Sequence, residues 1–492
     1  MGKFLKTLSL LLCLCAMLTA VCSCGLLKKG NSEDSVSDSV ENSGDVVDDN
    51  GYEKDSIDRT LGGREIIILM DTSSHSDIMP GEGSKDAVQN KAYIRSLELK
   101  KRLGCTFDVQ LAPGEWKGMS DFVAAAEKAG INKVDVICAF SLVPSTLQQN
   151  GFLSNLKNLQ YPELDKPWWP ESVKQWEHDG ALYYVANNSS NRVIRAQSVV
   201  FANTKMIEQN GLVPLDEKVL NYEWTVELML QYAKTVPIDD ILDDDSLFGL
   251  SVDDSSRMDQ FYYGAGLTMM DRNGDGEIVL SALEESSKSK TTRLISKLGE
   301  IASTNGFYIN NEGSRQSATM MVQNRTMFLA GYMNLVFSLD DASTYIPLPT
   351  PMFEPSEDPR YYTTPHNSYD TWCVPHTASN KEDSALVIEA FASSDYREMA
   401  PYFYDKCLKM RYSESENGIK IFDLIRNSTN VDFGRITSRT MDIMEGPFRS
   451  CFFRGGKTEF SMLYESELGS AGVNWQTNLE TIVTTFALWK DQ

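Results

Sequence analysis

The chain has 492 residues, of which 42% are hydrophobic and 23% are charged, and its formal net charge is −23. This composition is typical of a globular protein, and the length suffices for about two or three domains. The acidic balance argues against a nucleic-acid partner, because phosphate binding needs clustered Lys and Arg, and equally against direct electrostatic docking on anionic lipid.

The first 23 residues have the layout of an export signal. Lys3 and Lys6 precede an apolar stretch, residues 8–21, which is shorter than the ~20 residues needed to span a bilayer. The stretch that ends at Cys24 resembles a bacterial lipoprotein box, in which the cysteine is lipidated after cleavage, and the residues before Cys22 fit that pattern less well. We therefore expect a signal peptide at 1–23, a lipid on Cys24, and a position on the extracytoplasmic side of the cell membrane.

An acidic linker, residues 24–61, is expected to follow. Between Gly30 and Arg59 the chain is rich in Ser, Asp, Glu and Asn, and large aliphatic residues are few. Such a segment buries too little apolar surface to offset its ordering entropy, and its like charges repel one another. We predict a disordered stalk that packs on nothing.

The next segment is predicted to alternate between strands and helices. The predicted strands are continuous apolar runs without polar alternation, which is typical of a parallel sheet covered on both faces. The strands are 64–70, 106–111 and 134–138, and the helices are 93–103 and 120–129. The predicted fold class is therefore α/β.

The carboxyl ends of these strands indicate where a ligand would bind. In open sheets of this kind, ligands bind outside the carboxyl ends. The loops that start at Asp71, Ala112 and Ala139 would form this rim. The candidate ligand contacts on it are Asp71, Ser73, Phe140 and Ser141.

Several short motifs occur in a consistent order along the chain. They are 134–137 with Gly151-Phe152-Leu153, Lys166-Pro167-Trp168-Trp169 with 180–185, 199–206 with Glu223-Trp224-Thr225, Phe248-Gly249-Leu250, and 327–332. In their order and spacing they resemble the family 1 extracellular solute-binding proteins, the lipoprotein receptors of ABC importers for sugars or oligosaccharides. Thr204, beside the usual Asn-Lys pair, departs from the family pattern.

The resemblance implies a two-lobed periplasmic-binding-protein-like fold of type II, with a hinge and a ligand cleft at the interface between the lobes. We place the N-terminal lobe at 62–186 and 293–345, and the C-terminal lobe at 187–292 and 346–492. The resemblance also implies a lipid-anchored monomer that captures a carbohydrate and delivers it to the transmembrane permeases of an ABC transporter. Such a protein is not an enzyme and needs no cofactor.

Aromatic rings are the expected chemistry of a sugar cleft, because the C–H faces of a sugar pack on them. Tyr332 is the first candidate, since the matching position of the family carries a ring into the cleft. Tyr184 and Trp372 are further candidates, and Asn187 lies on a predicted crossing between the lobes.

Patterns for metals and disulfides are weak in this chain. Asp271, Asn273 and Asp275 copy the first half of a calcium loop, but Ala282 stands where such a loop needs its last carboxylate. A polar turn is the better interpretation, with calcium as a minor alternative. The cysteines of the folded part are interpreted as isolated core residues, with a single disulfide left open; they are Cys105, Cys138, Cys373, Cys407 and Cys451.

Two other classes compete with a transport receptor. A secreted, glycosidase-like enzyme would need two carboxylates across a cleft, and a chain with 69 acidic residues always offers some such pair. No H-E-x-x-H, G-x-S-x-G or Walker motif occurs in the sequence. A non-transport receptor on the same fold has no sequence feature that separates it from a transport receptor.

Overall fold

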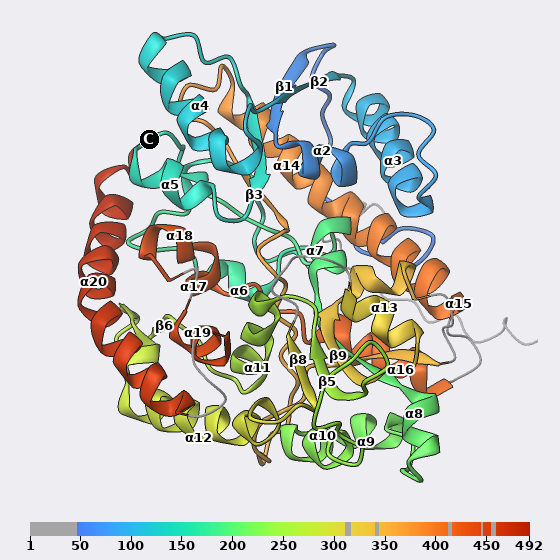
Figure 1. The fold of residues 1–492 in the computed structure, drawn as a ribbon. Coiled ribbons are helices and arrows are strands. Elements are labelled where there is room, and N and C mark those ends of the chain that lie inside the picture. Colours follow the sequence, from blue (N-terminus) through green and yellow to red (C-terminus); the bar gives the residue numbers. More distant parts are fainter. Residues whose placement is uncertain (1–46, 310–315, 340–343, 412–415, 444–445, 454–458) are drawn as a thin grey trace, which may run out of the picture. The chain divides into compact units, whose positions relative to one another are not determined.

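The computed structural model describes residues 47–309, 316–339, 344–411, 416–443, 446–453 and 459–492. From residue 47 onward the chain contains two main β-sheets with their accompanying helices (Figure 1). The predicted signal peptide, the predicted lipidation site Cys24 and the linker up to residue 46 lie outside the described residues. None of the described helices combines the length and the hydropathy that a membrane crossing requires.

The first sheet has the strand order β11-β3-β1-β2. β1 (Glu65–Met70) pairs in parallel with β2 (Thr106–Leu111) and β3 (Val136–Phe140), whereas β11 (Asp370–Cys373) runs antiparallel to β3. The parallel pairing predicted for the first three strands is confirmed. The helices that accompany this sheet are α2 (Thr72–Ile78), α3 (Ala87–Leu103), α4 (Glu115–Ala129), α5 (Pro144–Gln149) and α14 (Lys381–Ser394) (Figure 1).

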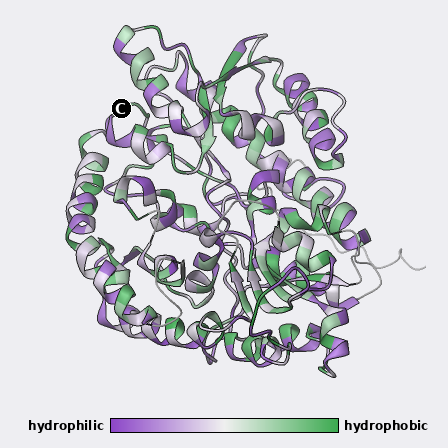
Figure 2. Cartoon of the chain, in the orientation of Figure 1, coloured by the Kyte–Doolittle hydropathy of each residue, from purple (hydrophilic) through white to green (hydrophobic). Residues whose placement is uncertain are grey.

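The second sheet has the order β10-β4-β9-β5-β8. Its strands are β4 (Ser198–Asn203), β5 (Phe248–Val252), β8 (Phe307–Ile309), β9 (Thr326–Tyr332) and β10 (Tyr345–Pro349). β5 is parallel to β8 and β9, and β4 is antiparallel to β9 and β10. Every residue of β4, β5 and β9 is buried, and the apolar residues of these strands contribute to the hydrophobic colouring at the centre of the second sheet in Figure 2.

The helices around the second sheet are mostly short. They are α7 (Asn191–Ala196), α8 (Thr204–Gln209), α9 (Asp216–Leu220), α10 (Val226–Ala233), α11 (Asp259–Gly264), α12 (Glu285–Ala302), α13 (Gln316–Val322), α15 (Lys409–Arg411) and α16 (Glu416–Asn427). β6 (Asp271–Arg272) and β7 (Ile278–Val279) form a small hairpin. Helix α6 (Glu171–Lys174) precedes α7. Single 3-10 turns occupy Leu156–Asn158, Ser255–Met258, Ser281–Leu283 and Met333–Phe337, and π-helical turns occupy Asp395–Met399 and Tyr402–Leu408.

The strand pairing differs from the predicted division into lobes. β8 and β9 fall in the stretch 293–345, which was predicted for the first lobe, but they pair within the second sheet. β11 falls in the stretch 346–492, which was predicted for the second lobe, but it pairs with β3 of the first sheet. These pairings join residues far apart in the sequence, so no local pattern reports them. The chain therefore passes from the first sheet to the second before β4, and returns between β10 and β11.

The C-terminal helices contact helices that accompany both sheets. α17 (Phe433–Ile436), α18 (Ser438–Met441) and α19 (Pro447–Phe453) precede the long helix α20 (Phe460–Leu488). With 29 residues α20 is roughly 43 Å long. It contacts α5, α12, α18 and α19, and it runs along the edge of the ribbon in Figure 1. Just beyond its end, the ring of Trp489 lies against Gly151, where an added Cβ would meet it at 2.8 Å.

The predicted stalk packs on the folded body from residue 47 onward, so the prediction is wrong for that part. The side chain of Asp55 is 2% exposed and forms ion pairs with Arg102 and Arg397. Ser393 donates to the same carboxylate at 2.6 Å. Lys166 pairs with Glu53 nearby. This part of the segment has little apolar surface, and ion pairs and hydrogen bonds hold it on the folded body instead.

Candidate functional site

A pocket lies among α11, the helices α17 to α20 and the chain crossing that follows β10. The part of it that the centres of water-sized spheres can occupy is about 40 Å³, within a space of about 530 Å³ that includes open solvent at its mouth. The aromatic residues that line it are Tyr262, Tyr263, Phe448, Tyr464 and Trp475. The charged and polar residues that line it are Asp259, Asn367, Arg435, Ser438 and Arg449.

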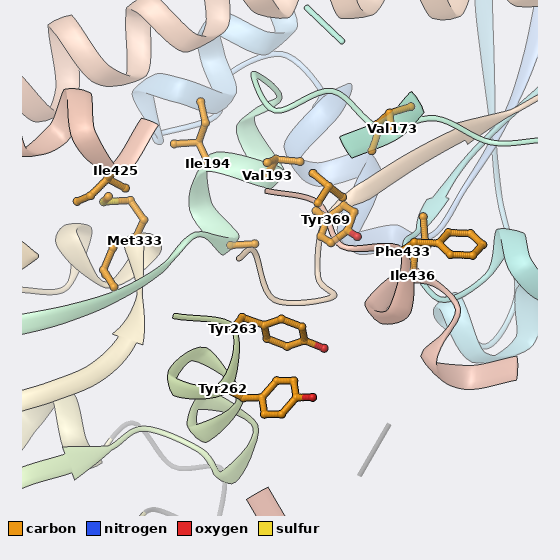
Figure 3. Close-up of a cluster of buried hydrophobic side chains, with 14 of the residues drawn as sticks. Val173, Val193, Ile194, Tyr262, Tyr263, Met333, Tyr369, Ile425, Phe433 and Ile436 are labelled. Atoms are coloured by element: carbon orange, nitrogen blue, oxygen red, sulfur yellow. The ribbon is translucent and has the colours of Figure 1, made fainter. Parts of the chain in front are cut away.

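Helix α11 supplies one wall of this pocket. Asp259, Tyr262 and Tyr263 share one face of the helix, because residues three and four apart are neighbours on an α-helix. The two rings meet edge to face, with centroids 5.4 Å apart, and the hydroxyl of Tyr262 donates to the carbonyl of Thr268 at 3.0 Å. Figure 3 shows both rings projecting from α11 in the same direction, with Tyr369 above them in that view.

Arg435 connects the walls of the pocket. Asp432 caps α17 by accepting from the backbone N–H of Arg435 at 2.8 Å, which fixes the start of this short helix. The guanidinium of Arg435 donates to Asn367 Oδ1 at 3.2 Å and to Asp259 Oδ2 at 3.3 Å. It also lies 5.0 Å from the centroid of the Tyr263 ring, within the range of a cation–π contact.

The loop after β3 reaches the same region from the first sheet. Ser141 Oγ donates to the backbone carbonyl of Asn367 at 2.8 Å, and its backbone N–H donates to the carbonyl of Tyr369 at 3.0 Å. Phe140 stacks on Trp116 with centroids 4.8 Å apart. Of the predicted rim residues, Ser141 is thus joined through Asn367 to the wall of the pocket.

Tyr332 lies at the end of β9 in a cluster of charged and aromatic groups. The guanidinium carbon of Arg257 is 3.4 Å from the centroid of its ring, and Arg257 also donates to its hydroxyl. The ring of His366 is 4.9 Å away. Burial raises the pKa of Tyr332 to about 12, against the opposing charge of Arg257. Tyr332 does not line the pocket described above, and its part in ligand binding stays a prediction.

Burial and the nearby positive charges both lower the pKa of His366. Burial lowers its pKa well below the ordinary value, and the charges of Arg257, Arg435 and Arg449 lower it further. The imidazole is therefore neutral near pH 7. Its Nδ1 lies 3.3 Å from the backbone nitrogen of Ser368, which donates to it.

Asp71, Ser73 and Asn187 lie away from the pocket. Asp71 is fully buried; its carboxylate caps α2 and accepts from Ser74 at 2.9 and 2.6 Å. Ser73 is exposed on the same helix. Asn187 is buried and donates to Asp395 at 3.2 Å. The two buried side chains thus have partners within the fold.

Tyr184 and Trp372 are core side chains in this structure. Tyr184 packs against Trp176 and Phe486, with ring centroids 5.8 and 6.5 Å away. The indole N–H of Trp372 donates to Asp370 at 2.9 Å, and its ring packs on Phe391 of α14. Both side chains are 1% exposed, so ligand contact would require them to leave the core.

The predicted calcium loop forms the turn of the β6–β7 hairpin. The side chain of Asn273 accepts from the backbone N–H groups of Asp275 and Glu277, at 3.0 and 2.9 Å. Across the described part of the chain, no group of three or more His, Cys, Asp or Glu side chains is arranged to hold a metal ion. Cys105, Cys138, Cys373, Cys407 and Cys451 are free thiols.

The sequence motifs did not indicate most of the residues that line the pocket. Tyr262 and Tyr263 were not among the predicted site residues, because nothing in the sequence separates them from aromatic residues of the core. Arg435 and Arg449 lie in no motif. Their common feature, a shared contact with Asp259, joins segments about 180 residues apart, and only the folded chain displays it.

No family model and no curated protein matches the sequence. Solved structures do match the fold. The galacto-N-biose/lacto-N-biose I-binding protein of the ABC transporter from Bifidobacterium longum, in complex with lacto-N-biose, has a TM-score of 0.56 at 12% identity, covering 85% of this chain and 98% of that one. UgpB from Mycobacterium tuberculosis, in complex with glycerophosphocholine, has a TM-score of 0.55 at 12% identity, covering 84% and 98%.

A third similar structure is an ABC substrate-binding protein from Listeria monocytogenes in complex with cycloalternan. Its TM-score is 0.53 at 12% identity, covering 84% of this chain and 99% of that one. The chain therefore has the α/β fold of ABC-transporter solute-binding proteins. The fold predicted from the sequence resemblance is confirmed.

Proposed function

We propose that this chain is a lipid-anchored, extracytoplasmic solute-binding protein that captures a sugar or oligosaccharide and delivers it to the permease of an ABC transporter. The observation that carries the proposal is the pocket formed by α11, α17 to α20 and the crossing segment, where aromatic rings and polar groups converge. The fold it shares with sugar-binding receptors supports the same assignment.

The chemistry of the pocket suits a sugar. The rings of Tyr262, Tyr263 and Phe448 offer flat apolar surface on which the C–H face of a pyranose can pack. Asn367 and Ser438 offer groups that can bond sugar hydroxyls. A pocket with apolar walls and few convergent polar groups is the usual form of a small-molecule site.

A binding role is favoured over hydrolysis. A glycosidase uses two carboxyl groups, about 5 to 9.5 Å apart, on either side of the scissile bond. Among the described residues that line this pocket, Asp259 alone carries a carboxylate, and it is already paired with two arginines. Two of the similar structures named above, those from Bifidobacterium longum and Listeria monocytogenes, are binding proteins.

A thermal-shift screen of mono- and oligosaccharides tests the proposal. A ligand that binds the folded state at 100 times its Kd adds about 2.7 kcal/mol to the free energy of unfolding, so a binding sugar should raise Tm. Chromogenic glycosides are added in parallel, and none should be turned over. Turnover would identify the chain as an enzyme, and a screen in which no sugar raises Tm would contradict a sugar receptor.

The lipid anchor is proposed from the sequence alone, since Cys24 lies outside the described residues. Cys24→Ala should abolish lipidation, so that the protein either stays an uncleaved precursor or is released from membranes. Cys22→Ala is the matched control and should be processed normally. If Cys24→Ala is still lipidated and Cys22→Ala is not, the anchor is Cys22.

A further inference from the structure

A second pocket lies beside the first, at the start of α17. Asp432 and Phe433 line it, whereas Arg435 of the same helix lines the first pocket. Its other walls are the β6–β7 hairpin, Gln175 just after α6, and Tyr362 on the crossing after β10 (Figure 1). The centres of water-sized spheres can occupy about 210 Å³ of it, within a space of about 740 Å³ that includes open solvent at its mouth. The second pocket is therefore the roomier of the two.

The two pockets are separated where α17 meets the segment before β6. Met269 lines the first pocket and Met270 lines the second. A Cβ added to Gly434 of α17 would meet the Cβ of Met269 at 2.9 Å and the backbone nitrogen of Met270 at 3.2 Å. The backbone of α17 thus packs directly on this segment, with no room for a side chain between them. At this contact the second pocket is closed off from the first.

Two aromatic rings form part of the lining. Tyr362 is half-buried, and its ring lies against Gly266, where an added Cβ would meet the ring carbon Cε2 at 3.2 Å. Gly266 has a φ of +70°, which glycine adopts readily, so both its backbone angle and the ring require a residue without a side chain. Phe433 supplies the second ring. Such rings offer apolar surface to the C–H face of a sugar.

Polar groups that are free to bond a ligand lie beside these rings. The backbone holds Tyr362 and Asn430 close together, because Thr363 N–H donates to the carbonyl of Ser428 and Asn430 N–H donates to the carbonyl of Thr363, both at 2.9 Å. The hydroxyl of Tyr362 and the side-chain amides of Asn430 and Gln175 form no hydrogen bond with the described part of the chain. Together they offer both donors and acceptors, as the hydroxyl groups of a sugar require.

The charged groups of the lining have different roles. The guanidinium of Arg272 donates to the carbonyls of Gln175 at 3.0 Å and Gly276 at 2.5 Å, so it ties the hairpin to the end of α6. Asp432 is 6% exposed, and burial raises its pKa to about 6, which leaves it ionised near pH 7. Because a carboxylate accepts strongly from hydroxyl groups, Asp432 adds an acceptor for a sugar.

We propose that the second pocket is a further carbohydrate site, in which a neutral sugar packs on the ring of Tyr362 and its hydroxyls bond to Asn430 and Gln175. The inference goes beyond the proposed function, which needs the first pocket alone. The chain would then hold two sugars, one on each side of the contact between Gly434 and Met269.

Binding of the full chain, purified in detergent, to an array of neutral mono-, di- and oligosaccharides of glucose, galactose, mannose and xylose tests this inference. Tyr263→Ala removes a ring of the first pocket, so a sugar that this variant binds as tightly as the unmodified chain does is held elsewhere. We expect at least one such sugar. Adding Asn430→Ala to this variant should weaken its binding at least tenfold. Adding Asn427→Ala, at an exposed position outside the lining, is the matched control and should leave it unchanged.

Each outcome decides between the two pockets. If Tyr263→Ala weakens the binding of every sugar, the first pocket binds them all and the inference is wrong. It is equally wrong if Asn430→Ala and Asn427→Ala retain the sugar alike. If Asn430→Ala does not fold, Gln175→Ala, at an exposed position, takes its place. Sugars that all depend on Asn430 and none on Tyr263 would support the second site and contradict the first. If no sugar binds the unmodified chain, both sites are contradicted.

Discussion

Arg435 of α17 donates to the carboxylate of Asp259 on α11 at 3.3 Å, across 176 positions of sequence. The same guanidinium donates to Asn367, on the segment that returns from the second sheet to the first. Asn367 in turn accepts from Ser141 after β3. These contacts place one buried cation where α11, α17 and the chain crossing meet, so a ligand bound beside it would contact elements associated with both sheets.

Tyr332 is expected to contribute to stability through both its ring and its hydroxyl. Tyr332→Ala removes a 6%-exposed ring on which Arg257 lies, and should lower the free energy of unfolding by about 3–5 kcal/mol. Tyr332→Phe keeps the ring and should cost about 1 kcal/mol, for the hydrogen bond lost. Urea unfolding of both variants measures this. Near-native stability of the alanine variant would show that the ring is not packed as described.

The docked part of the linker is expected to stabilise the folded body. Asp55→Asn should cost about 1–3 kcal/mol, because it leaves Arg102 and Arg397 without their carboxylate. Asp49→Asn, at an exposed position of the same segment, is the matched control. Differential scanning calorimetry compares them. Equal Tm values for both variants would mean that this segment does not dock in solution.

Gly151 is expected to anchor the end of the C-terminal helix. Gly151 and Gly180 have similar positive φ angles, +72° and +75°, so alanine should strain the backbone similarly at either position. Only at Gly151 would the new Cβ meet Trp489, at 2.8 Å, whereas nothing lies within 4 Å of a Cβ at Gly180. Gly151→Ala should therefore cost about 1–3 kcal/mol more than Gly180→Ala. If urea unfolding shows that the two variants lose the same free energy of unfolding, the contact between Gly151 and Trp489 is contradicted.

His366 is expected to make the fold sensitive to mild acid. Its pKa is lower in the folded chain than the ordinary 6.5, so below that pH the unfolded chain binds more protons than the folded one. The stability contributed by the neutral imidazole is thus present above pH 6.5 and is lost as the pH falls below it, by up to about 1.4 kcal/mol per pH unit.

Urea unfolding at pH 7.5, 6.5 and 5.5 checks the effect of His366. His366→Gln cannot gain a proton and should lose less stability than the unmodified chain between pH 6.5 and 5.5. Parallel losses in the two proteins would show that His366 titrates at its ordinary pKa in the folded chain, and that burial and the three arginines do not lower it.

The first sheet was predictable because its signals are local. β1 and β2 match the predicted strands to within one residue, since continuous apolar runs bounded by Gly and polar residues mark buried strands. The motif 327–332, which carries part of the family resemblance, coincides with the end of β9 at Tyr332. The pairing of β9 with β4, and of β11 with β3, was not predicted, because it depends on contacts between distant segments.

Local sequence patterns could not predict the pocket or the docked linker, for a related reason. Asp55 looks like any solvated acid in an acidic segment, and Arg449 like any arginine on a short helix. What gives each its role is a partner that folding brings close: Arg102 and Arg397 for Asp55, and Asp259 for Arg449. Charged residues also lack the periodicity that makes apolar faces visible in a sequence.

The affinity of Tyr263→Ala for the sugar found in the thermal-shift screen tests the central claim most directly. Tyr263 is 8% exposed and lines the pocket, whereas Tyr232 on α10 is 6% exposed and does not line it, so Tyr232→Ala controls for the loss of a buried ring. By calorimetric titration we expect Tyr263→Ala to bind at least tenfold more weakly, about 1.4 kcal/mol, and Tyr232→Ala to bind as the unmodified chain does. Unchanged affinity in Tyr263→Ala would place the sugar elsewhere and contradict the account.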